Sequence, residues 1–515
     1  MPPGVEHTSA NKHICVIVGR TRHKMVQIEI LEAAKRGARL IEVRLDFLAK
    51  APDYKRLLGN KPCEMIATVR RPQDGGRWSG SEEARQMLIR QAIVSGFDWV
   101  DLETDVADDI PRFKNVKRIV SYHNLREVPA DLEKIHEKMC QQDADVVKIA
   151  VRAQHNTDNL RVLNLLRKPA KPTIAFCIGD LGLPTRILGA KFGVPFTYAA
   201  FNKERGIAPG LPSFEEMKNV FHYERVNGDT AIYGVIGDPV GHSLSPVLHN
   251  AAFHSLRFNG VYLPFRVPRG ELEAFLKDYD SLPVMGYSVT IPHKEAAAAY
   301  AKHKDTPVSL TQAANTLVRR QDGFEAANTD YQAVIDSLLA NMPPSQDGAP
   351  STLHSRGVLL IGAGGVARAI AHALHREGVL LTIVNRTPER AQKLAEEVGC
   401  RVLDWAARHS VMCEILINAT SVGMHPNVDE SPVHNSFLKP GLIVLDTVYT
   451  PETTLLIKEA KLRGCQVITG VDMFVRQAAA QFRLFTGQDA PVEFLRTVMK
   501  RHLSPVSLKS PEERK

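Results

Sequence analysis

The first two hundred residues alternate short apolar runs with amphipathic stretches. Eight runs, about 25 residues apart, have the length and apolar character of buried strands, and helical periodicity fills most of the intervals between them. The runs are residues 13–19, 38–48, 64–70, 97–103, 118–123, 145–151, 172–179 and 194–201. Eight strands that alternate with helices predict a parallel sheet closed into a (β/α)8 barrel over residues 13–222.

The pattern changes after residue 222. Residues 223–230 are polar and are predicted to be a linker, and a second α/β half begins at residue 231. A Pro-, Ser- and Gly-rich stretch, residues 341–357, interrupts this half and indicates a further linker. The run "VLLIGAGGVARAI" then starts a nucleotide-type unit. The overall prediction is an α/β protein with two unlike halves.

Length and composition narrow the class of protein. A chain of 515 residues is too long for one core, and no run approaches the ~20 apolar residues of a membrane span. The start, "MPPGVEHTSANKH", lacks the apolar core of a secretion signal and the arginines of a transit peptide. Seven cysteines without paired spacing predict reduced thiols, no metal site of the Cys type and a cytoplasmic location.

The net charge of +8 raises the question of a nucleic-acid partner. No basic stripe interleaved with aromatic residues occurs along the chain, which argues against one. Anionic small substrates explain the excess of arginine better, because charged residues gather near the predicted strand ends.

In a barrel of this type the active site lies at the carboxyl ends of the strands. Within "LIEVRLDFL", Glu42, Arg44 and Asp46 alternate with apolar residues, so we expect them on one strand face. Arg70 ends the next strand, and Arg186 is expected in the loop after the seventh. Arginines at these places can hold a carboxylate, or can form a structural ion-pair network with the acidic residues.

A lysine, Lys148, interrupts the apolar run "ADVVKIAV". Lysine is rarely buried without a partner. In a low-dielectric site it loses its charge readily, and the neutral amine can attack a carbonyl to form an imine. His123, at the end of the fifth strand, can move protons near neutral pH. The alternative is a salt-bridged lysine and a hydrogen-bonded histidine.

These residues resemble type I 3-dehydroquinate dehydratase over nearly all of residues 13–215. The resemblance rests on "EVRLDFL", "TVRRPQDGG", "SYHNL", "VVKIAV" and "APG". It implies a (β/α)8 barrel in which Lys148 forms an imine with the C3 ketone of 3-dehydroquinate and His123 is the general acid/base for loss of water. It also implies four substrate-binding residues, Glu42, Arg44, Arg70 and Arg186.

Three positions depart from the family pattern. Asp74 stands where bacterial members usually have a glutamate that partners the histidine, so Asp74 is a candidate partner of His123. Ile207 and Leu211 replace a serine and a glutamine that would bond substrate hydroxyls. Lost hydrogen bonds to a polyol cost roughly 1–3 kcal/mol each. A second interpretation therefore stays open, an active dehydrogenase joined to a degenerate or retuned barrel.

In the second half, "VIGDPVGHSLSPVLHNAAF" places Ser243 and Ser245 before a predicted helix, where hydroxyls cap the helix or hold a substrate. Further on, "YSVTIPHKE" contains Lys294 and "AANTDY" contains Asp330. If the fold brings these two together, they can carry the proton that accompanies hydride transfer. Each taken alone is typical of a surface charge, and spacing does not show that they meet.

A glycine-rich turn gives the stronger signal. A buried strand runs into a turn and a helix, which suits a pyrophosphate at a helix N-terminus. About 20 residues later a second strand ends in Asn385, Arg386 and Thr387. Arg386 suits a 2′-phosphate where an acidic residue would favour NAD, so NADP is the expected cofactor. The three glycines are Gly362, Gly364 and Gly365.

This half resembles shikimate dehydrogenase over about residues 231–500. The resemblance rests on "SLSP", "VTIPHKE", "AANT", "NTDY", "GAGG", "NRT", "NATSVGM", "DTVYTPETTLL" and "GVDMFVRQAAAQF". It implies that Lys294 and Asp330 are the catalytic pair. The implied substrate-binding residues are Ser243, Ser245, Thr290, Asn315, Tyr449 and Gln477. The implied NADP-binding residues are Gly362, Gly364, Gly365, Asn385, Arg386 and Thr387, with Gly470 and Met473 near the nicotinamide.

The resemblance also implies the domain limits. A shikimate-binding domain is expected over residues 231–335, completed by C-terminal helices at about 475–500, and a Rossmann domain over 336–474, with a flexible tail at 501–515. Ser288 is a departure, since bacterial members often have asparagine there. The serines and threonine that differ in quinate-preferring relatives are kept, which favours shikimate.

Together the two resemblances imply a fused dehydroquinate dehydratase–shikimate dehydrogenase of the pathway to aromatic amino acids. The expected ligands are small carboxylates, namely 3-dehydroquinate, 3-dehydroshikimate and shikimate, with no metal and no membrane or nucleic-acid partner. A metabolite-sensing regulator is the alternative from another class, and the complete Lys148/His123 and Lys294/Asp330 sets argue against it. The sequence predicts no oligomeric state.

Overall fold

A computed structural model describes residues 13–113, 115–206, 208–241, 243–342 and 351–503. Four features considered above lie wholly or partly outside these residues: most of the N-terminal stretch, Ile207, residues 343–350 of the Pro-rich linker and residues 504–515 of the tail. The chain forms two compact units, one of Met1–Gly234, Pro239–Pro246 and Arg257–Val284, the other of Val235–Asp238, Val247–Leu256 and Met285–Lys515. No helix of the described residues combines the length and apolar character that a membrane span needs.

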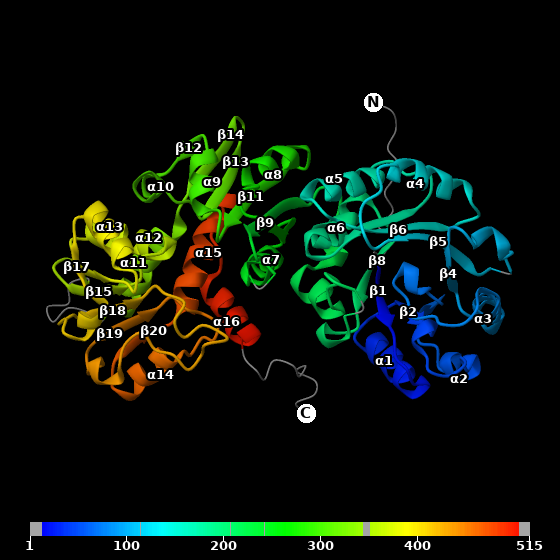
Figure 1. Ribbon diagram of the computed structural model, residues 1–515, viewed down its shortest axis with the longest axis horizontal. Helices are drawn as coiled ribbons and strands as arrows, with labels where there is room; N and C mark the ends of the chain where they lie inside the picture. Colours follow the sequence, from blue (N-terminus) through cyan, green and yellow to red (C-terminus); the bar gives the residue numbers. More distant parts are fainter. Residues whose placement is uncertain (1–12, 114, 207, 242, 343–350, 504–515) are drawn as a thin grey trace. The chain divides into compact units, whose positions relative to one another are not determined.

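The predicted barrel is confirmed, with eight parallel strands in the order β7-β6-β5-β4-β3-β2-β1-β8 (Figure 1). Strands β7 and β8 end this order, so the barrel is nearly closed. The strands are β1 (His13–Val18), β2 (Leu40–Arg44), β3 (Glu64–Thr68), β4 (Trp99–Glu103), β5 (Lys117–Asn124), β6 (Val146–Arg152), β7 (Thr173–Ile178) and β8 (Phe196–Ala200).

Helices alternate with these strands and lie outside them (Figure 1). One of them shows the local rules clearly: it begins after Ser81, whose hydroxyl accepts from the Ala84 N–H, and it ends at Gly96 in the left-handed region (φ 112°). The helices of this half are α1 (His23–Lys35), α2 (Tyr54–Leu58), α3 (Glu82–Ser95), α4 (Leu132–Gln141), α5 (Asn156–Leu165) and α6 (Leu183–Leu188).

Three local expectations in this half need correction. Strand β2 ends at Arg44, and Asp46 lies in a 3-10 turn, Leu45–Phe47, because the chain turns there to let Asp46 accept from Arg44 and from the Arg77 N–H (2.9 Å). Arg186 lies in helix α6 and not in the loop that the sequence predicts. Within the polar stretch 223–230, Tyr223 is fully buried in a short 3-10 helix.

The second half contains two six-stranded sheets. The first is mixed, in the order β10-β9-β11-β13-β14-β12, with β11–β13 and β13–β14 antiparallel and β12–β14 parallel. Its strands are β9 (Ala231–Gly237), β10 (Gly260–Arg266), β11 (Val284–Val289), β12 (His303–Lys304), β13 (Thr316–Arg320) and β14 (Gly323–Ala327). The helices along this stretch are α7 (Ser245–Ser255), α8 (Leu272–Asp278), α9 (Lys294–Tyr300) and α10 (Thr306–Thr311).

The other sheet is parallel, in the order β17-β16-β15-β18-β19-β20, which is the 3-2-1-4-5-6 order of a Rossmann fold. Successive apolar side chains of β15 lie on opposite faces of the sheet. Val358 and Leu360 pack into one core, and Leu359 and Ile361 pack into another on the opposite face. The strands are β15 (Gly357–Ile361), β16 (Leu380–Val384), β17 (Arg401–Leu403), β18 (Ile415–Asn418), β19 (Ile443–Asp446) and β20 (Gln466–Ile468).

Helices cover both faces of this sheet (Figure 1). They are α11 (Thr329–Asn341), α12 (Gly365–Arg376), α13 (Pro388–Val398), α14 (Leu455–Leu462), α15 (Gly470–Thr486) and α16 (Val492–Leu503). Helix α11 runs across the expected domain limit at residue 335, and α15 runs across the one at 474. These two helices pack against each other, so both limits fall within a helix pair that joins the two sheets.

Candidate active sites

A cavity that is open to solvent lies among the barrel strands, mostly toward their carboxyl ends. It contains every described residue that the sequence singled out for the barrel except Asp46. Its polar lining residues are Glu42, Arg44, Arg70, Asp74, His123, Lys148, Arg186 and Tyr198. Its apolar and small lining residues are Ile17, Gly75, Leu125, Ala150, Phe176, Ile178, Ala208 and Leu211.

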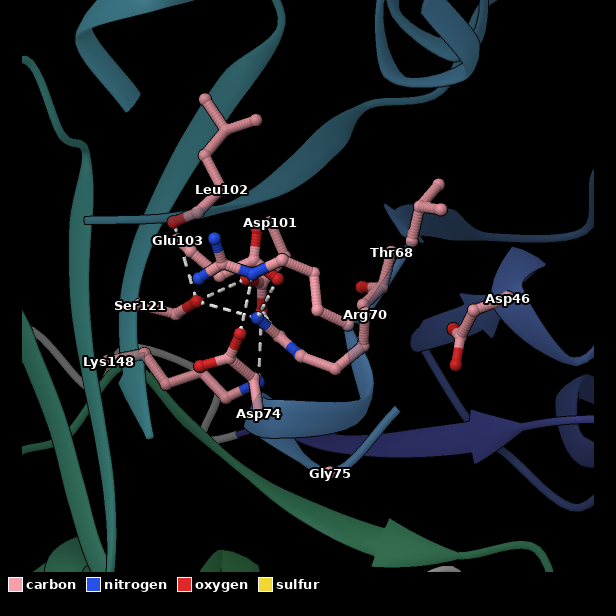
Figure 2. Close-up of polar contacts among 12 residues, drawn as sticks. Asp46, Thr68, Arg70, Asp74, Gly75, Asp101, Leu102, Glu103, Ser121 and Lys148 are labelled. Atoms are coloured by element: carbon pink, nitrogen blue, oxygen red, sulfur yellow. Dashed lines mark hydrogen bonds and ion pairs between the residues drawn. The ribbon is translucent and has the colours of Figure 1, made fainter. Parts of the chain in front are cut away.

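Lys148 lies in the middle of β6 with 5 % of its surface exposed. Its Nζ is 2.9 Å from Oδ2 of Asp101 and 4.2 Å from the centre of the Tyr198 ring. Figure 2 shows Lys148, Arg70 and Asp101 converging from three neighbouring parts of the barrel. The lysine therefore has an ionic partner, as the structural alternative required, and it also faces the cavity, as the catalytic interpretation required.

Asp101 is the centre of the charge network. Its carboxylate accepts from Arg70 Nη2 (2.8 Å) and from the Ser121 hydroxyl (2.6 Å), in addition to Lys148. Burial alone would raise the pKa of Asp101, but the positive charges of Arg70 and Lys148 outweigh it and hold that pKa well below its ordinary value. Asp101 is thus ionised and keeps both cations in place.

Sequence reasoning missed Asp101 and its neighbour Glu103. Glu103 accepts from Arg70 Nη1 (3.0 Å) and from Arg85 Nη1 (2.7 Å). Both acids lie in β4, Asp101 in its middle and Glu103 at its end, where "WVDLE" alternates apolar and acidic residues. Such alternation at the carboxyl end of a barrel strand is the signal that would have found them.

His123 lies near the end of β5, where it pairs in register with Ala150 of β6. Burial, and then the charges of Arg70 and Lys148, hold the pKa of His123 well below its usual range. Its buried Nδ1 has no hydrogen-bond partner among the described residues. The imidazole is therefore neutral near pH 7, which is the form that can accept a proton.

Asp74, the candidate partner of His123, lines the same cavity but makes another bond. Its Oδ2 accepts from Arg71 Nε at 2.7 Å, and Arg71 also binds Asp105 at 2.8 Å. No hydrogen bond joins Asp74 to His123 within the described part of the chain. The carboxylate is thus held toward Arg71 in this state of the protein.

The two outer arginines differ in their partners. Arg44 donates to both oxygens of Asp46 at 2.9 and 2.8 Å, which matches the ion-pair alternative. Arg186 has no carboxylate partner among the described residues: its guanidinium stacks over the Phe176 ring at 4.1 Å, and its buried Nε is unbonded. Burial lowers the pKa of Arg186 to about 10. This unpaired cation is the natural place in the cavity for an anionic group.

Gly210 lets the last barrel loop approach the cavity. It has φ +68°, and a Cβ there would lie 2.3 Å from the Gly179 carbonyl oxygen. The Gly179 N–H donates to the Pro209 carbonyl at 3.2 Å and so joins this loop to the residue that follows β7. Ala208 and Leu211 consequently line the cavity, and Leu211 also packs against the barrel core.

In the second half the fold brings Lys294 and Asp330 together, which sequence spacing did not show. Lys294 starts α9 and Asp330 lies in the first turn of α11. The lysine Nζ is 2.6 Å from Oδ2 of Asp330, and both side chains are partly exposed. A charge-assisted pair of this length can pass a proton to a ligand placed beside it.

Asn315 fixes the start of α11. Its amide accepts from the Thr329 N–H (2.9 Å) and donates to the Thr329 hydroxyl (2.9 Å), one residue before Asp330. Gln481, which the sequence did not single out, donates to the Asn315 carbonyl (3.0 Å) and accepts from the Ser288 hydroxyl (2.7 Å). The departure at Ser288 is therefore accommodated by a buried bond to helix α15.

Tyr449 and Gln477 lie next to Phe474. The Tyr449 ring stacks on the Phe474 ring at 4.5 Å and 22°, and Gln477 Nε2 donates to the Phe474 carbonyl at 3.1 Å. Burial, and then the negative charge of Asp330, raise the pKa of Tyr449. Tyr449 is therefore within electrostatic reach of the Asp330 carboxylate.

The remaining predicted substrate residues have local bonds. The Thr290 N–H donates to the Ile236 carbonyl at 2.9 Å, directly after β11. The Ser243 hydroxyl accepts from the Ser245 N–H at 3.3 Å, where α7 begins. This bond satisfies a free N–H at the helix start, as the capping alternative predicted for Ser243.

The glycine turn after β15 has the shape that a pyrophosphate needs. Gly362 has φ +120°, and a Cβ there would lie 2.7 Å from the Ala419 carbonyl oxygen. A Cβ on Gly364, the residue before α12, would meet open space, and one on Gly365 would lie 3.9 Å from Lys294 Cδ. The helix N-terminus is thus open to an anion and lies beside Lys294.

The other predicted cofactor residues surround this edge of the sheet. Arg386 is exposed after β16, and Asn385 Nδ2 donates to the Thr387 carbonyl at 2.9 Å. Gly470 starts α15, where a Cβ would lie 2.4 Å from the Val448 carbonyl oxygen, and Met473 is buried one turn later. An exposed cation, an open helix N-terminus and a close glycine contact fit a dinucleotide with a 2′-phosphate.

Within the described ranges, no group of three or more His, Cys, Asp or Glu side chains is arranged to hold a metal ion.

Four family models match the chain in sequence order. They are Type I 3-dehydroquinase over residues 14–227, the shikimate dehydrogenase substrate binding domain over 235–317, shikimate / quinate 5-dehydrogenase over 346–444 and the shikimate 5'-dehydrogenase C-terminal domain over 470–500.

Solved structures match the second half. A crystal structure of shikimate dehydrogenase in complex with NADP+ has a TM-score of 0.51 and 31 % identity, covering 54 % of this chain and 98 % of its own. Shikimate dehydrogenase of Aquifex aeolicus has a TM-score of 0.50 and 30 % identity, covering 53 % of this chain and 99 % of its own. Among curated relatives, a shikimate dehydrogenase (NADP(+)) of Methanopyrus kandleri is 39 % identical over 54 % of this chain and 98 % of its own length.

A barrel with a buried lysine in its cavity, followed by a nucleotide-binding dehydrogenase fold, defines a two-part enzyme, a lyase joined to an oxidoreductase. One relative spans both parts: the chloroplastic bifunctional 3-dehydroquinate dehydratase/shikimate dehydrogenase of Arabidopsis thaliana is 38 % identical over 93 % of this chain and 82 % of its own length. The chain belongs to the family of bifunctional 3-dehydroquinate dehydratase/shikimate dehydrogenases.

Proposed function

We propose that the two halves perform consecutive steps on one carbon ring. The barrel converts 3-dehydroquinate into 3-dehydroshikimate and water, and the second half reduces 3-dehydroshikimate to shikimate with NADPH. All three ring compounds are carboxylates, which fits the arginines of the barrel cavity. The seven cysteines are free thiols, which supports a reducing compartment, and we propose the cytoplasm.

In the barrel, Lys148 is the nucleophile. Its ammonium group first gives up a proton to solvent, and the neutral amine then adds to the C3 ketone. Loss of water from the adduct forms an imine, which withdraws electrons from the ring and makes the neighbouring carbon acidic. His123, neutral because its pKa is lowered, takes the proton from that carbon and gives it to the departing hydroxyl, which leaves as water. Hydrolysis of the imine then frees the product and restores Lys148.

Arg186 holds the substrate carboxylate in this proposal. It is the buried guanidinium in the cavity that has no carboxylate partner among the described residues, whereas Arg44 binds Asp46 and Arg70 binds Asp101. A bidentate bond to the ring carboxylate would give Arg186 the anionic partner that the folded chain does not supply. This observation carries the proposal for the barrel.

In the second half, Lys294 and Asp330 handle the proton that the new hydroxyl group gains. NADPH, when bound at the glycine turn with its 2′-phosphate near Arg386, supplies the hydride. Lys294 donates the proton to the carbonyl oxygen as it is reduced, and Asp330, 2.6 Å away, keeps the lysine oriented. Tyr449 and Gln477, beside Phe474, are proposed to bind the ring substituents.

Two features favour the second interpretation of the barrel, in which dehydration is weak or retuned. Leu211 places an apolar side chain in the cavity, and Asp74 is bonded to Arg71 instead of His123. A substrate hydroxyl near Leu211 finds no hydrogen-bond partner there.

One experiment separates these outcomes. The purified chain is mixed with 3-dehydroquinate without NADPH, borohydride is added, and the reduced adduct on Lys148 is sought by mass spectrometry while the enone absorbance is followed. We expect both the adduct and the enone. An adduct without enone would mean that the lysine works but elimination has stalled at Asp74 or Leu211. The absence of both, with 3-dehydroshikimate still reduced by NADPH, would refute the dehydratase.

A further inference from the structure

Two loops at the carboxyl edge of the Rossmann sheet meet at one buried carboxylate. Asp446 ends β19 and stands opposite Asn418, which ends β18. Both side chains are completely buried. Neither residue was singled out from the sequence, and neither has a role in the chemistry described above.

Asp446 holds both ends of the loop that follows it, residues 447–454. Its Oδ1 accepts from the Val448 N–H at 3.0 Å, and its Oδ2 accepts from the Thr454 hydroxyl at 2.6 Å. The same Thr454 oxygen accepts from the Ile457 N–H at 3.3 Å and so begins helix α14. The loop is therefore closed upon a single side chain.

The carboxylate is also tied to the nucleotide turn. Asn418 Nδ2 donates to Oδ1 of Asp446 at 3.0 Å and to the Val422 carbonyl at 3.2 Å. The next carbonyl oxygen, that of Ala419, lies 2.7 Å from the position of a Cβ on Gly362. Asn418 and Asp446 thus connect the loop that binds the cofactor with the loop at 447–454.

The loop closed by Asp446 carries Tyr449. The Tyr449 ring stacks on Phe474 of α15, and its pKa responds to the charge of Asp330. One residue earlier, the Val448 carbonyl abuts Gly470 at the start of the same helix, where a Cβ would lie 2.4 Å from its oxygen. A small shift of residues 447–449 would therefore move Tyr449 relative to the catalytic carboxylate.

Burying a carboxylate without a cation is unfavourable unless its oxygens accept hydrogen bonds. Burial raises the pKa of Asp446 to about 6, and its hydrogen-bond donors, Thr454, Val448 and Asn418, are all uncharged. These donors come from the two loops that border the dehydrogenase site. The unfavourable burial is thus offset by bonds whose geometric effect is to set the two loops.

We propose that Asp446 is a positioning residue of the dehydrogenase, which closes the 447–454 loop and so holds Tyr449 where the substrate binds. It does not touch the substrate itself. The inference rests on the proposed function, because it takes Tyr449 to be a substrate contact.

The test uses Asp446→Asn and Thr454→Val in the full chain. Asp446→Asn keeps one oxygen for Val448 and Asn418 but places an amide donor at Thr454, whose oxygen already accepts from the Ile457 N–H, so the bond that the hydroxyl donates is lost. Thr454→Val removes the hydroxyl itself. In each we expect KM for 3-dehydroshikimate to rise about tenfold, the size of one buried hydrogen bond, with kcat and KM for NADPH changed less than about threefold. The double variant is expected to be no worse than the more severe single one.

Thr454→Ser restores the hydroxyl and is expected to stay within about twofold of the unaltered chain. Asp404→Asn is the matched control, since the Asp404 carboxylate accepts from the Ala406 N–H at 2.8 Å at another turn of the same domain. KM for NADPH, which needs a folded nucleotide turn, reports whether the dehydrogenase half has folded. Unchanged KM in Asp446→Asn, or a Thr454→Ser variant that behaves like Thr454→Val, would overturn the proposal.

A readout that needs no activity separates this inference from the proposed function. Hydrogen exchange followed by mass spectrometry is expected to show faster exchange over residues 447–454 in Asp446→Asn than in Asp404→Asn. If the unaltered chain failed to reduce 3-dehydroshikimate, the proposed function would fall, and faster exchange would still support Asp446 as the residue that closes the loop. Equal exchange in the two variants would refute that closure.

Discussion

The two halves of this chain differ in how the charged side chains of their sites are buried and paired. In the barrel, Lys148, Arg70 and Asp101 are buried with their partners in one network across β4, β6 and the end of β3. In the dehydrogenase half, Lys294 and Asp330 form a single, partly exposed pair. Uncharged amides and hydroxyls around it do the positioning. In the proposed mechanism the barrel must generate a nucleophile from its own side chain, whereas the dehydrogenase needs only to orient a cofactor, a substrate and one proton donor.

This difference predicts where the halves are most vulnerable. A buried network of charges loses function when any member is removed, because the remaining charges are left unpaired. A solvent-accessible pair tolerates such a change better in stability but loses the chemistry that it performs. Because both activities reside on one chain, the activity of the unaltered half reports how much intact chain each assay contains.

The largest expected effect is that of Lys148→Arg. Arginine keeps the positive charge beside Asp101 but forms no imine, so we expect dehydration to fall about 10³-fold or more. The borohydride adduct should disappear, and the reduction of 3-dehydroshikimate should change less than about twofold. Dehydration that survives in this variant would remove Lys148 from the mechanism.

Asp330→Asn is expected to come next. The change leaves the size of the side chain but removes the charge that orients Lys294, so kcat of the dehydrogenase should fall about 10²-fold, within the usual range for a lost acid–base partner. The measurement is NADPH oxidation with 3-dehydroshikimate, with dehydratase activity as the control. Asp336→Asn, on the exposed side of the same helix, should have no effect.

Arg186→Met sharpens the comparison within the barrel, because it removes the cation that has no acidic partner. We expect KM for 3-dehydroquinate to rise about 30-fold, the size of a charge-assisted hydrogen bond, with a smaller change in kcat. Arg112→Met is the control, since Arg112 is a barrel arginine already paired with Asp143 and Asp145 on the surface. Equal KM in the two variants would contradict the assignment of Arg186.

Arg386→Ala tests an exposed arginine of the dehydrogenase, which is proposed to bind the 2′-phosphate as Arg186 is proposed to bind the carboxylate. Loss of one contact with the 2′-phosphate should raise KM for NADPH about tenfold and leave KM for NADH nearly unchanged. Arg401→Ala, an exposed arginine on the neighbouring strand β17, provides the control. An equal rise in KM for NADPH and for NADH would show that Arg386 does not bind the 2′-phosphate.

The smallest expected effect concerns the pH dependence of dehydration. His123 acts as the base only when neutral, and its lowered pKa means that it is protonated only below its ordinary value of 6.5. The acid limb of kcat/KM for dehydration should therefore begin below pH 6.5, with less than about a twofold change between pH 7.5 and 6.5. A limb centred at or above pH 6.5 would contradict a neutral, buried histidine.

The order of elements, the barrel and the Rossmann sheet followed from the sequence, because apolar periodicity and glycine placement are local properties of the chain. The sequence also singled out Lys148, His123 and Arg186, which line one cavity of the barrel, because a charged or titratable residue in or near an apolar run is visible along the chain. The wrong local predictions concern chain direction after a strand: Asp46 lies in a turn, and Arg186 in a short helix.

Only the tertiary structure decided which charges meet. Lys294 and Asp330 are 36 residues apart, Lys148 and Asp101 are 47 apart, and Asp74 is bonded to Arg71 although His123 lines the same cavity. It also decided that Arg186 is left without a carboxylate partner and that Asp446 closes the loop of Tyr449. Electrostatic and hydrogen-bond partners depend on distance in space and on burial, which periodicity along the chain does not encode. Strands, helices and tight turns depend on neighbours in sequence, and periodicity does encode those.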